Sequence, residues 1–177
     1  AVIAGGLVRT SPEGARVGGW RTHVQALDMR TLGLGGDSLI GWEKRKLRIG
    51  PRRVGPVSWL ADRRPETIDA FDWLRRHVDY FDVSTSRMAL VSTNGHGDAA
   101  GLKLSDVERR TLDLLGERPH CLQELAERVT GDKWAHVPLG RLEDAHLIQR
   151  CGLTPTDLRP ATGQSGLWNA EAAERMC

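Results

Sequence analysis

The stretch from Gly33 to Ser38 constrains the fold most, because its Gly-Leu-Gly-Gly-Asp-Ser string directly precedes a predicted strand. Glycines let the backbone turn sharply and bring its N–H groups close to an anion or polar ligand. Asp37 could hold a metal-bound water or accept a proton here, and Ser38 or Thr31 could donate to a substrate carbonyl. The other interpretation is a tight turn between strands, with Asp37 bonding to its own backbone.

The hydrophobic pattern predicts short strands in the first part of the chain. Val2-Ile3 and Leu7-Val8 flank Gly5-Gly6 and predict a hairpin. Residues 39–42 and 46–49 predict two further strands, of which the second is expected to end at Gly50-Pro51.

From Pro65 the pattern takes a helical period, and apolar residues predict a helix over 67–78. Residues 88–91 then predict a buried strand. The glycine-rich, polar residues 94–98 are expected to form the main linker.

After this linker the sequence predicts three short helices and a strand. Ser105 and Glu108 match a capping box at the first helix start. The second helix is expected to begin at 119–121 and to end at Gly131. Apolar residues over 137–145 predict the third helix, and 147–153 predict a strand and turn. This order outlines a winged-helix domain.

The composition is that of a globular protein, with 40% hydrophobic and 27% charged residues. A net charge of +2 is too mild to indicate a polyanion partner. The three cysteines are odd in number and widely spaced, which argues against a disulfide framework. The sequence shows no signal peptide and no long apolar run, so we expect a cytoplasmic location and no membrane partner.

Histidines and cysteines are not arranged as metal ligands. Zinc sites usually contain tight pairs such as C-x₂-C or H-x₃-H, and the sequence has none, so no metal site is expected. A nucleophilic role for Cys121 beside His120 lacks an evident Asp or Asn partner in the sequence.

Three strings in this chain resemble the hydantoinase/oxoprolinase family. The first runs from Val17-Gly18-Gly19-Trp20-Arg21-Thr22 through Asp28-Met29-Arg30-Thr31 to Ser38. The second is Gly152-Leu153-Thr154-Pro155-Thr156-Asp157, and the third is Trp168-Asn169-Ala170-Glu171-Ala172-Ala173. They occur in the family's order, and Gly50-Pro51-Arg52-Arg53 fits the same alignment.

The resemblance implies an actin-like, ribonuclease-H-like ATPase fold. Family members use ATP and a divalent metal to open cyclic amides such as hydantoins or 5-oxoproline. The positions that match the motif, and would line the active-site cleft of the intact protein, are Arg21, Thr22, Asp28, Thr31, Gly33, Gly35, Gly36, Asp37 and Ser38. Their individual roles are not assigned. Arg21 could contact a phosphate or pair with Asp28.

The chain departs from the family in one respect: no D-x-GG-T-x-T-D phosphate loop occurs in it. Phosphoryl transfer depends on positioning by such loops and Mg²⁺. The chain also opens on a strand-like Ala1-Val2-Ile3. We therefore expect a fragment that is inactive and binds no cofactor alone, and whose partner is the rest of the parent chain or a second subunit.

The expected fold class is α+β, with a partial actin-like segment over 1–60, a connecting helix and strand over 61–98, a winged-helix-like domain over 99–159 and a tail over 160–177. The alternative function is a winged-helix nucleic-acid-binding or regulatory interaction module. Its reading helix would offer Lys133, Trp134, His136 and Arg141 but also Asp132, Glu143 and Asp144, so nucleic acid is not the expected partner. A third alternative is an interaction module that forms a homodimer through an exposed face.

Overall fold

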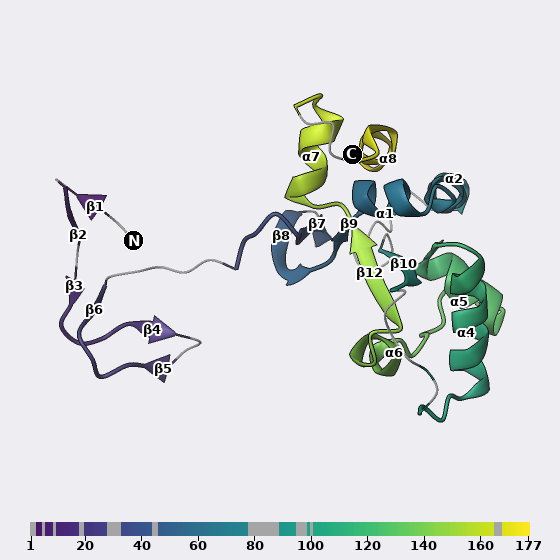
Figure 1. Cartoon of the computed structure of the whole chain (residues 1–177), viewed down its shortest axis with the longest axis horizontal. Helices are drawn as coiled ribbons and strands as arrows, with labels where there is room; N and C mark the ends of the chain where they lie inside the picture. The colour runs from purple at the N-terminus through teal and green to yellow at the C-terminus, as the bar shows by residue number, and fades with distance from the viewer. Residues whose placement is uncertain are drawn as a thin grey trace. The chain divides into compact units, whose positions relative to one another are not determined.

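The structure, a computed structural model, describes residues 3–4, 6–8, 10–17, 20–27, 33–43, 46–77, 89–94, 99, 101–164 and 168–177. The chain is α+β and divides into two compact units, Ala1–Gly33 and Leu34–Cys177 (Figure 1). This division falls inside the segment 1–60 expected from the sequence. Its physical reason is that Gly36 and Ile40 hydrogen-bond to residues 153–156, which groups them with the C-terminal part.

The first unit consists of short antiparallel pairs. β1 (Ile3–Ala4) pairs with β2 (Leu7–Val8) around Gly6, whose φ is 75°, so the predicted hairpin is confirmed. β3 (Thr10–Ser11) pairs with β6 (Ala26–Leu27), and β4 (Arg16–Val17) pairs with β5 (Trp20–Arg21).

The second unit is built around a four-stranded sheet of order β11-β10-β12-β9. β10 (Leu90–Thr93) runs antiparallel to β11 (His120–Cys121) and to β12 (Ile148–Gly152), and β12 runs parallel to β9 (Gly55–Pro56). Leu90 is opposite both Cys121 and Cys151. The expected buried strand over 88–91 is thus present as β10, two residues later; Met88 lies outside the described residues.

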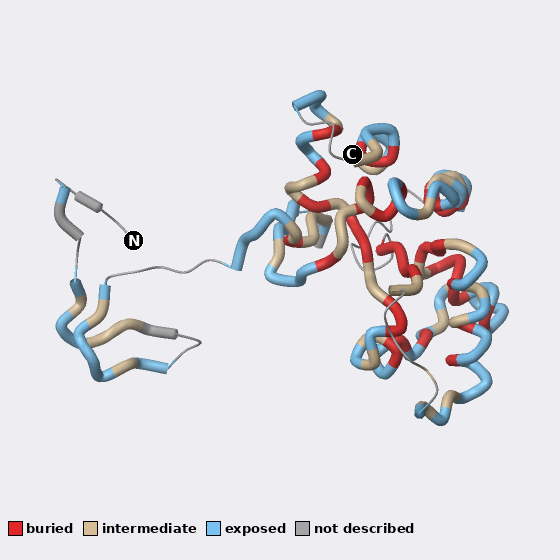
Figure 2. Tube along the Cα trace, in the orientation of Figure 1, coloured by how far each residue is buried: buried red, intermediate tan, exposed pale blue. Residues whose placement is uncertain are grey.

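Helices cover both faces of this sheet, which explains why neighbouring residues of β10 are buried. Leu90 belongs to a core formed with α1 (Val57–Arg63), α2 (Thr67–His77) and α8 (Ala170–Met176). Val91 belongs to a second core with α4 (Asp106–Glu117), α5 (Leu122–Thr130) and α6 (Gly140–Asp144). Figure 2 shows buried residues concentrated in the central strands and on the inner sides of these helices. A strand buried on both faces reads as a continuous apolar run.

A separate two-stranded sheet follows the glycine-rich string. β7 (Ser38–Glu43) pairs with β8 (Lys46–Arg53). The expectation that Gly50-Pro51 ends the second strand is wrong, because β8 continues through it to Arg53. A proline lacks an N–H donor, and an edge strand tolerates this loss because that donor has no ladder partner.

One helix start and one helix end follow from local sequence rules. Ser105 and Glu108 form the predicted capping box at α4, with bonds of 2.8 and 3.3 Å. α5 ends at Gly131, whose φ is 82°. The predicted start of α5 at 119–121 is wrong, because His120 and Cys121 pair with β10 before the helix begins at Leu122.

The predicted third helix over 137–145 is only five residues long in the structure, as α6. Lys133 and Trp134 lie in a turn before α6, and His136 lies in the irregular segment that follows the turn. The apolar residues Val137 and Leu139 are buried in this segment, before the helix starts. The order helix, strand, helix, helix, strand is present, but the expected reading helix is short.

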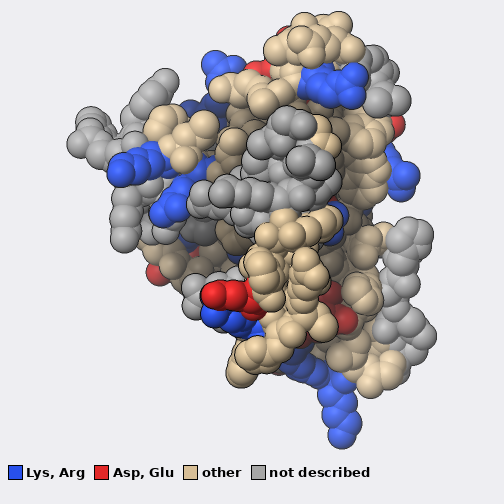
Figure 3. Space-filling model, turned by 90° about the vertical axis from the view of Figure 1, so that its left-hand side faces the viewer, with Lys and Arg blue, Asp and Glu red and all other residues tan. Residues whose placement is uncertain are grey.

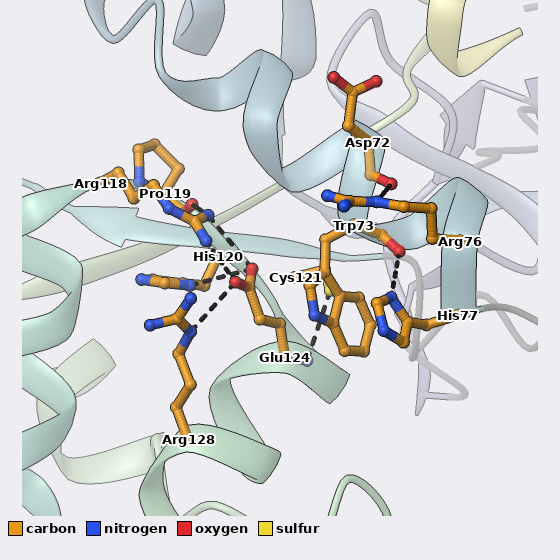
Figure 4. A network of polar contacts seen from close by, with 10 residues as sticks. All are labelled: Asp72, Trp73, Arg76, His77, Arg118, Pro119, His120, Cys121, Glu124 and Arg128. Carbon is orange, nitrogen blue, oxygen red and sulfur yellow. Dashed lines mark hydrogen bonds and ion pairs between the residues drawn. The ribbon is translucent and has the colours of Figure 1, made fainter.

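A buried carboxylate joins β11 and α5 (Figure 4). The Glu124 side chain is 1% exposed; its Oε1 accepts from Arg128 Nε at 3.1 Å, and its Oε2 accepts from Arg118 Nη1 at 3.2 Å. His120 Nδ1 lies 3.0 Å from Oε2. Burial raises the pKa of Glu124, but His120 and Arg118 outweigh this effect and lower the pKa to about 2.

This network predicts a dependence of stability on pH. Because the folded pKa of about 2 lies below the ordinary value of 4.5, the stability from Glu124 is present above pH 4.5 and is lost as the pH falls toward 2. We expect Glu124→Gln to lower the free energy of unfolding by about 3 kcal/mol at pH 7, because it leaves partly buried arginine without its charge partner.

Urea unfolding at pH 7 and pH 3 measures both effects. Glu127→Gln is the matched control, since Glu127 is exposed on the same helix. The wild type and the control should lose more stability between these two pH values than Glu124→Gln does. An equal loss in all three proteins would show that Glu124 does not supply this dependence.

Candidate functional site

The glycine-rich string forms a closed turn at the start of β7. Ser38 N donates to Gly35 O at 3.1 Å, and Gly35 N donates to Ser38 Oγ at 2.8 Å. Ser38 is 2% exposed, so its hydroxyl closes the turn rather than being open to a substrate. The string therefore has the local geometry of the strand-connecting turn that was one of the two sequence interpretations.

This turn lies against the Thr154–Asp157 string. Gly36 O accepts from Thr156 N at 3.0 Å and from Thr156 Oγ1 at 2.7 Å. A Cβ at position 36 would lie 2.8 Å from Thr156 Oγ1, so the close approach favours glycine. Ile40 N also donates to Leu153 O at 2.7 Å. Two strings that are about 120 residues apart are thus in direct contact.

Asp157 is fully buried where two helices begin. Its carboxylate accepts from Ser58 N at 2.9 Å, from Ser58 Oγ at 2.6 Å and from Val57 N at 3.4 Å, all at the start of α1. It also accepts from Thr154 N at 2.9 Å and Thr154 Oγ1 at 2.7 Å, at the start of α7 (Pro155–Ala161). Helix N-termini supply free N–H groups and a favourable dipole, which compensate the buried negative charge.

Asp37 pairs with an arginine on the neighbouring strand. Arg53 Nε donates to Asp37 Oδ2 at 2.5 Å, and Arg53 Nη2 contacts the same oxygen. This hydrogen bond lowers the pKa of Asp37 and raises the pKa of Arg53. Asp37 is therefore an ionised acceptor, and its expected role as a proton acceptor would first require release from Arg53.

Asp37 and Arg53 line a surface pocket of about 360 Å³ between β8, β9, β12 and α6. Across the pocket, Arg150 pairs with Glu143, with Nε to Oε1 at 2.5 Å and Nη2 to Oε2 at 3.3 Å. The remaining lining residues are Arg52, Val54, Gly55 and Gln149. We refer to this site as the arginine pocket.

The arginine pocket does not fit a divalent metal with ATP. A divalent metal prefers carboxylate oxygens, but Asp37 already pairs with Arg53 through Oδ2, and Glu143 pairs with Arg150 through both of its oxygens. The sequence also contains no D-x-GG-T-x-T-D string to hold the phosphates. No cluster of three or more His, Cys, Asp or Glu side chains suited to a metal occurs among the described residues.

The other predicted site residues lie in the first unit or outside the described residues. Arg21 Nη2 lies 2.9 Å from Glu13 Oε2, and the alternative pairing of Arg21 with Asp28 involves a residue outside the described ones. Thr22 Oγ1 accepts from Ala15 N at 2.9 Å and donates to Ala15 O at 3.1 Å, and so holds a hairpin. Asp28 and Thr31 lie outside the described residues, and Gly33 is exposed at the end of the first unit.

Most of the residues that line the pocket were not predicted as site residues from the sequence. Arg52 and Arg53 were noted only because Gly50-Pro51-Arg52-Arg53 fits the family alignment. Two adjacent arginines at the end of a predicted strand could have indicated a binding site. No local sequence pattern marks Gln149 and Arg150 as site residues, because the pairing of β12 with β9 brings them to the pocket. Glu143 joins them through its ion pair with Arg150.

The cysteine chemistry considered from the sequence finds no support in the geometry. Cys121 and Cys151 are buried, and burial raises the pKa of each thiol to about 12. Cys121 Sγ instead accepts from Glu124 N at the start of α5, at 3.4 Å. The thiolate form needed for nucleophilic attack is disfavoured at both positions.

Two charged residues of the predicted nucleic-acid reader are engaged in ion pairs, Arg141 with Glu108 and Glu143 with Arg150. Arg141 Nη1 contacts both carboxylate oxygens of Glu108 at 3.0 Å. Figure 3 shows lysine and arginine side chains in several separate groups on the face that it presents, with carboxylates beside some of them. No helix in the described part of the chain is long and apolar enough to cross a membrane.

No protein-family model, curated protein or solved structure gives a significant match to this chain. The hydantoinase/oxoprolinase resemblance therefore rests on the strings quoted above.

The position of Asp157 predicts a large effect of a nearly isosteric change. Asp157→Asn removes the charge and turns an amide group toward N–H donors, so we expect the free energy of unfolding to fall by about 3 kcal/mol. Chemical denaturation measures this loss, and Asp113→Asn, on the exposed side of α4, should change it by less than about 0.5 kcal/mol. Faster hydrogen exchange at the Ser58 amide would identify the start of α1 as the weakened point, whereas unchanged exchange and stability would contradict this role.

Proposed function

We propose that this chain supplies the glycine-rich and Gly-Leu-Thr-Pro-Thr-Asp segments of a hydantoinase/oxoprolinase-type enzyme that opens cyclic amides with ATP. The contact of Gly36 with Thr156 is the observation that supports this proposal most. The two strings were chosen only because they resemble family motifs. Two unrelated short strings about 120 residues apart would not be expected to lie in contact, whereas two strings from one active-site region would.

On this proposal the nucleotide is held by residues other than those of the arginine pocket. Phosphoryl transfer needs free carboxylates for the metal and a backbone cradle for the phosphates. Asp37 and Glu143 are paired with arginines, so they do not offer free carboxylates to a metal. The sequence also contains no D-x-GG-T-x-T-D loop to form the phosphate cradle. ATP and a divalent metal would therefore be bound by the rest of the parent protein or a partner subunit, and the chain alone would be inactive.

The finer fold expectations belong to the same proposal. An actin-like origin is proposed for residues 1–60, and a winged-helix-like arrangement for 99–159 on the order of α4, β11, α5, α6 and β12. A cytoplasmic location is favoured by the three free cysteines Cys121, Cys151 and Cys177. Homodimer formation through an exposed face remains part of the interaction-module alternative.

The nucleic-acid-binding alternative is less favoured by the contacts. Phosphate contacts need arginines and lysines that are free to leave their internal partners. Arg141 is held by Glu108, and α6 has only five residues. Salt-sensitive binding of duplex DNA by this chain alone would reverse this preference.

Release of ADP measured with hydantoin or 5-oxoproline tests the enzyme proposal. The 177-residue chain alone should release no ADP above the buffer rate, and the native polypeptide that contains it should release ADP only when a ring substrate is present. In that polypeptide, Thr156→Val should lower the rate about tenfold or more, because it loosens the glycine turn.

Thr162→Val is the matched control, since that hydroxyl bonds only to carbonyls of its own helix. Equal melting temperatures of the two variants would separate loss of activity from loss of folding. ATP turnover by the chain alone, or no ring-dependent turnover by the native polypeptide, would reject the proposal.

A further inference from the structure

The arginine pocket brings three guanidinium groups and two carboxylates to one surface depression. Arg53 pairs with Asp37 and Arg150 pairs with Glu143, so these four charges cancel. Arg52 has no ion-pair partner among the described residues. The pocket therefore carries a surplus positive charge.

The two ion pairs use the same edge of each guanidinium. Arg53 contacts Asp37 through Nε and Nη2, and Arg150 contacts Glu143 through Nε and Nη2. A guanidinium has five N–H groups, so the edge that carries Nη1 is not used in either pair. The carboxylates thus fix the orientation of two guanidiniums while leaving donors on each for a further acceptor.

This arrangement suits a small oxyanion. Planar guanidinium groups bind carboxylate and phosphate oxygens through paired N–H donors. The Gln149 side chain adds an uncharged polar group to the lining, and a volume of about 360 Å³ is small. Asp37 and Glu143 would repel a continuous polyanion, whereas a single oxyanion can contact the arginines alone.

We propose that the arginine pocket is a binding site for a small oxyanion, a carboxylate or a phosphate group, held by Arg52 together with the unused edges of Arg53 and Arg150. The site is separate from the nucleotide site of the proposed enzyme. The proposal rests on the contacts of this pocket, so its test does not depend on the reaction that the parent protein catalyses.

Titration of the ¹⁵N-labelled 177-residue chain tests this proposal without any turnover. Inorganic phosphate and acetate are added in separate series at constant ionic strength, maintained with chloride. We expect saturable shifts of the amide signals of Gly55, Gln149 and Arg150 in at least one series. A response to phosphate alone identifies a phosphoryl ligand, a response to acetate alone identifies a carboxylate ligand, and both responses identify a general oxyanion site.

Arg52→Gln is the decisive variant, because Arg52 is exposed and its loss breaks no described ion pair. Binding should become about tenfold weaker, as the loss of a charge-assisted hydrogen bond implies. Arg110→Gln, on the exposed side of α4, should bind as the wild type does. Unchanged binding in Arg52→Gln, equal shifts with chloride, or no saturable shift in either series would overturn the proposal.

Discussion

The buried carboxylate of Asp157 is the contact on which the second unit depends. A carboxylate removed from water is costly unless hydrogen bonds replace its hydration. Asp157 obtains these bonds from the first residues of α1 and from Thr154 at the start of α7. Two helices that lie about 100 residues apart in the sequence therefore begin at one charged group. α1 then packs with α2 and α8 in one core of the sheet, and α7 contacts α8.

The residues around Asp157 connect this junction to the candidate site. Thr156 binds the carbonyl of Gly36, and Leu153 accepts from Ile40 at the start of β7. β12, which leads into this segment, carries Arg150 and Gln149 to the pocket, and the residues before α1 carry Arg52 and Arg53. The segments that carry the arginines thus lead into the helices that Asp157 joins, because β12 precedes α7, and β8 and β9 precede α1.

Local rules explain which elements the sequence could predict. The β1–β2 hairpin, the Ser105–Glu108 capping box and the end of α5 at Gly131 each depend on residues within a few positions of one another. The parallel pairing of Cys151 with Gly55 depends instead on residues about a hundred positions apart, and periodicity contains no information on such pairs. The short strand His120–Cys121 was missed for the same reason, since it forms by pairing with β10. The glycine turn was predicted from the sequence, but the contacts of its residues with Thr156 and Arg53 could be identified only from the structure.

Strings that resemble catalytic motifs can serve the architecture of a site without contacting a substrate. Ser38 closes a turn, Gly36 allows a close approach, and Asp157 begins two helices, so each is explained by packing and hydrogen bonding. The chemistry of the pocket is instead carried by arginines, which are cations with N–H donors and no acceptor. Such groups can bind and orient an oxyanion, but they cannot hold a metal or remove a proton at neutral pH. If this chain contributes to the opening of a cyclic amide, its arginines therefore act in binding and orientation, and activation of the amide must come from carboxylates and phosphate-binding loops elsewhere in the enzyme.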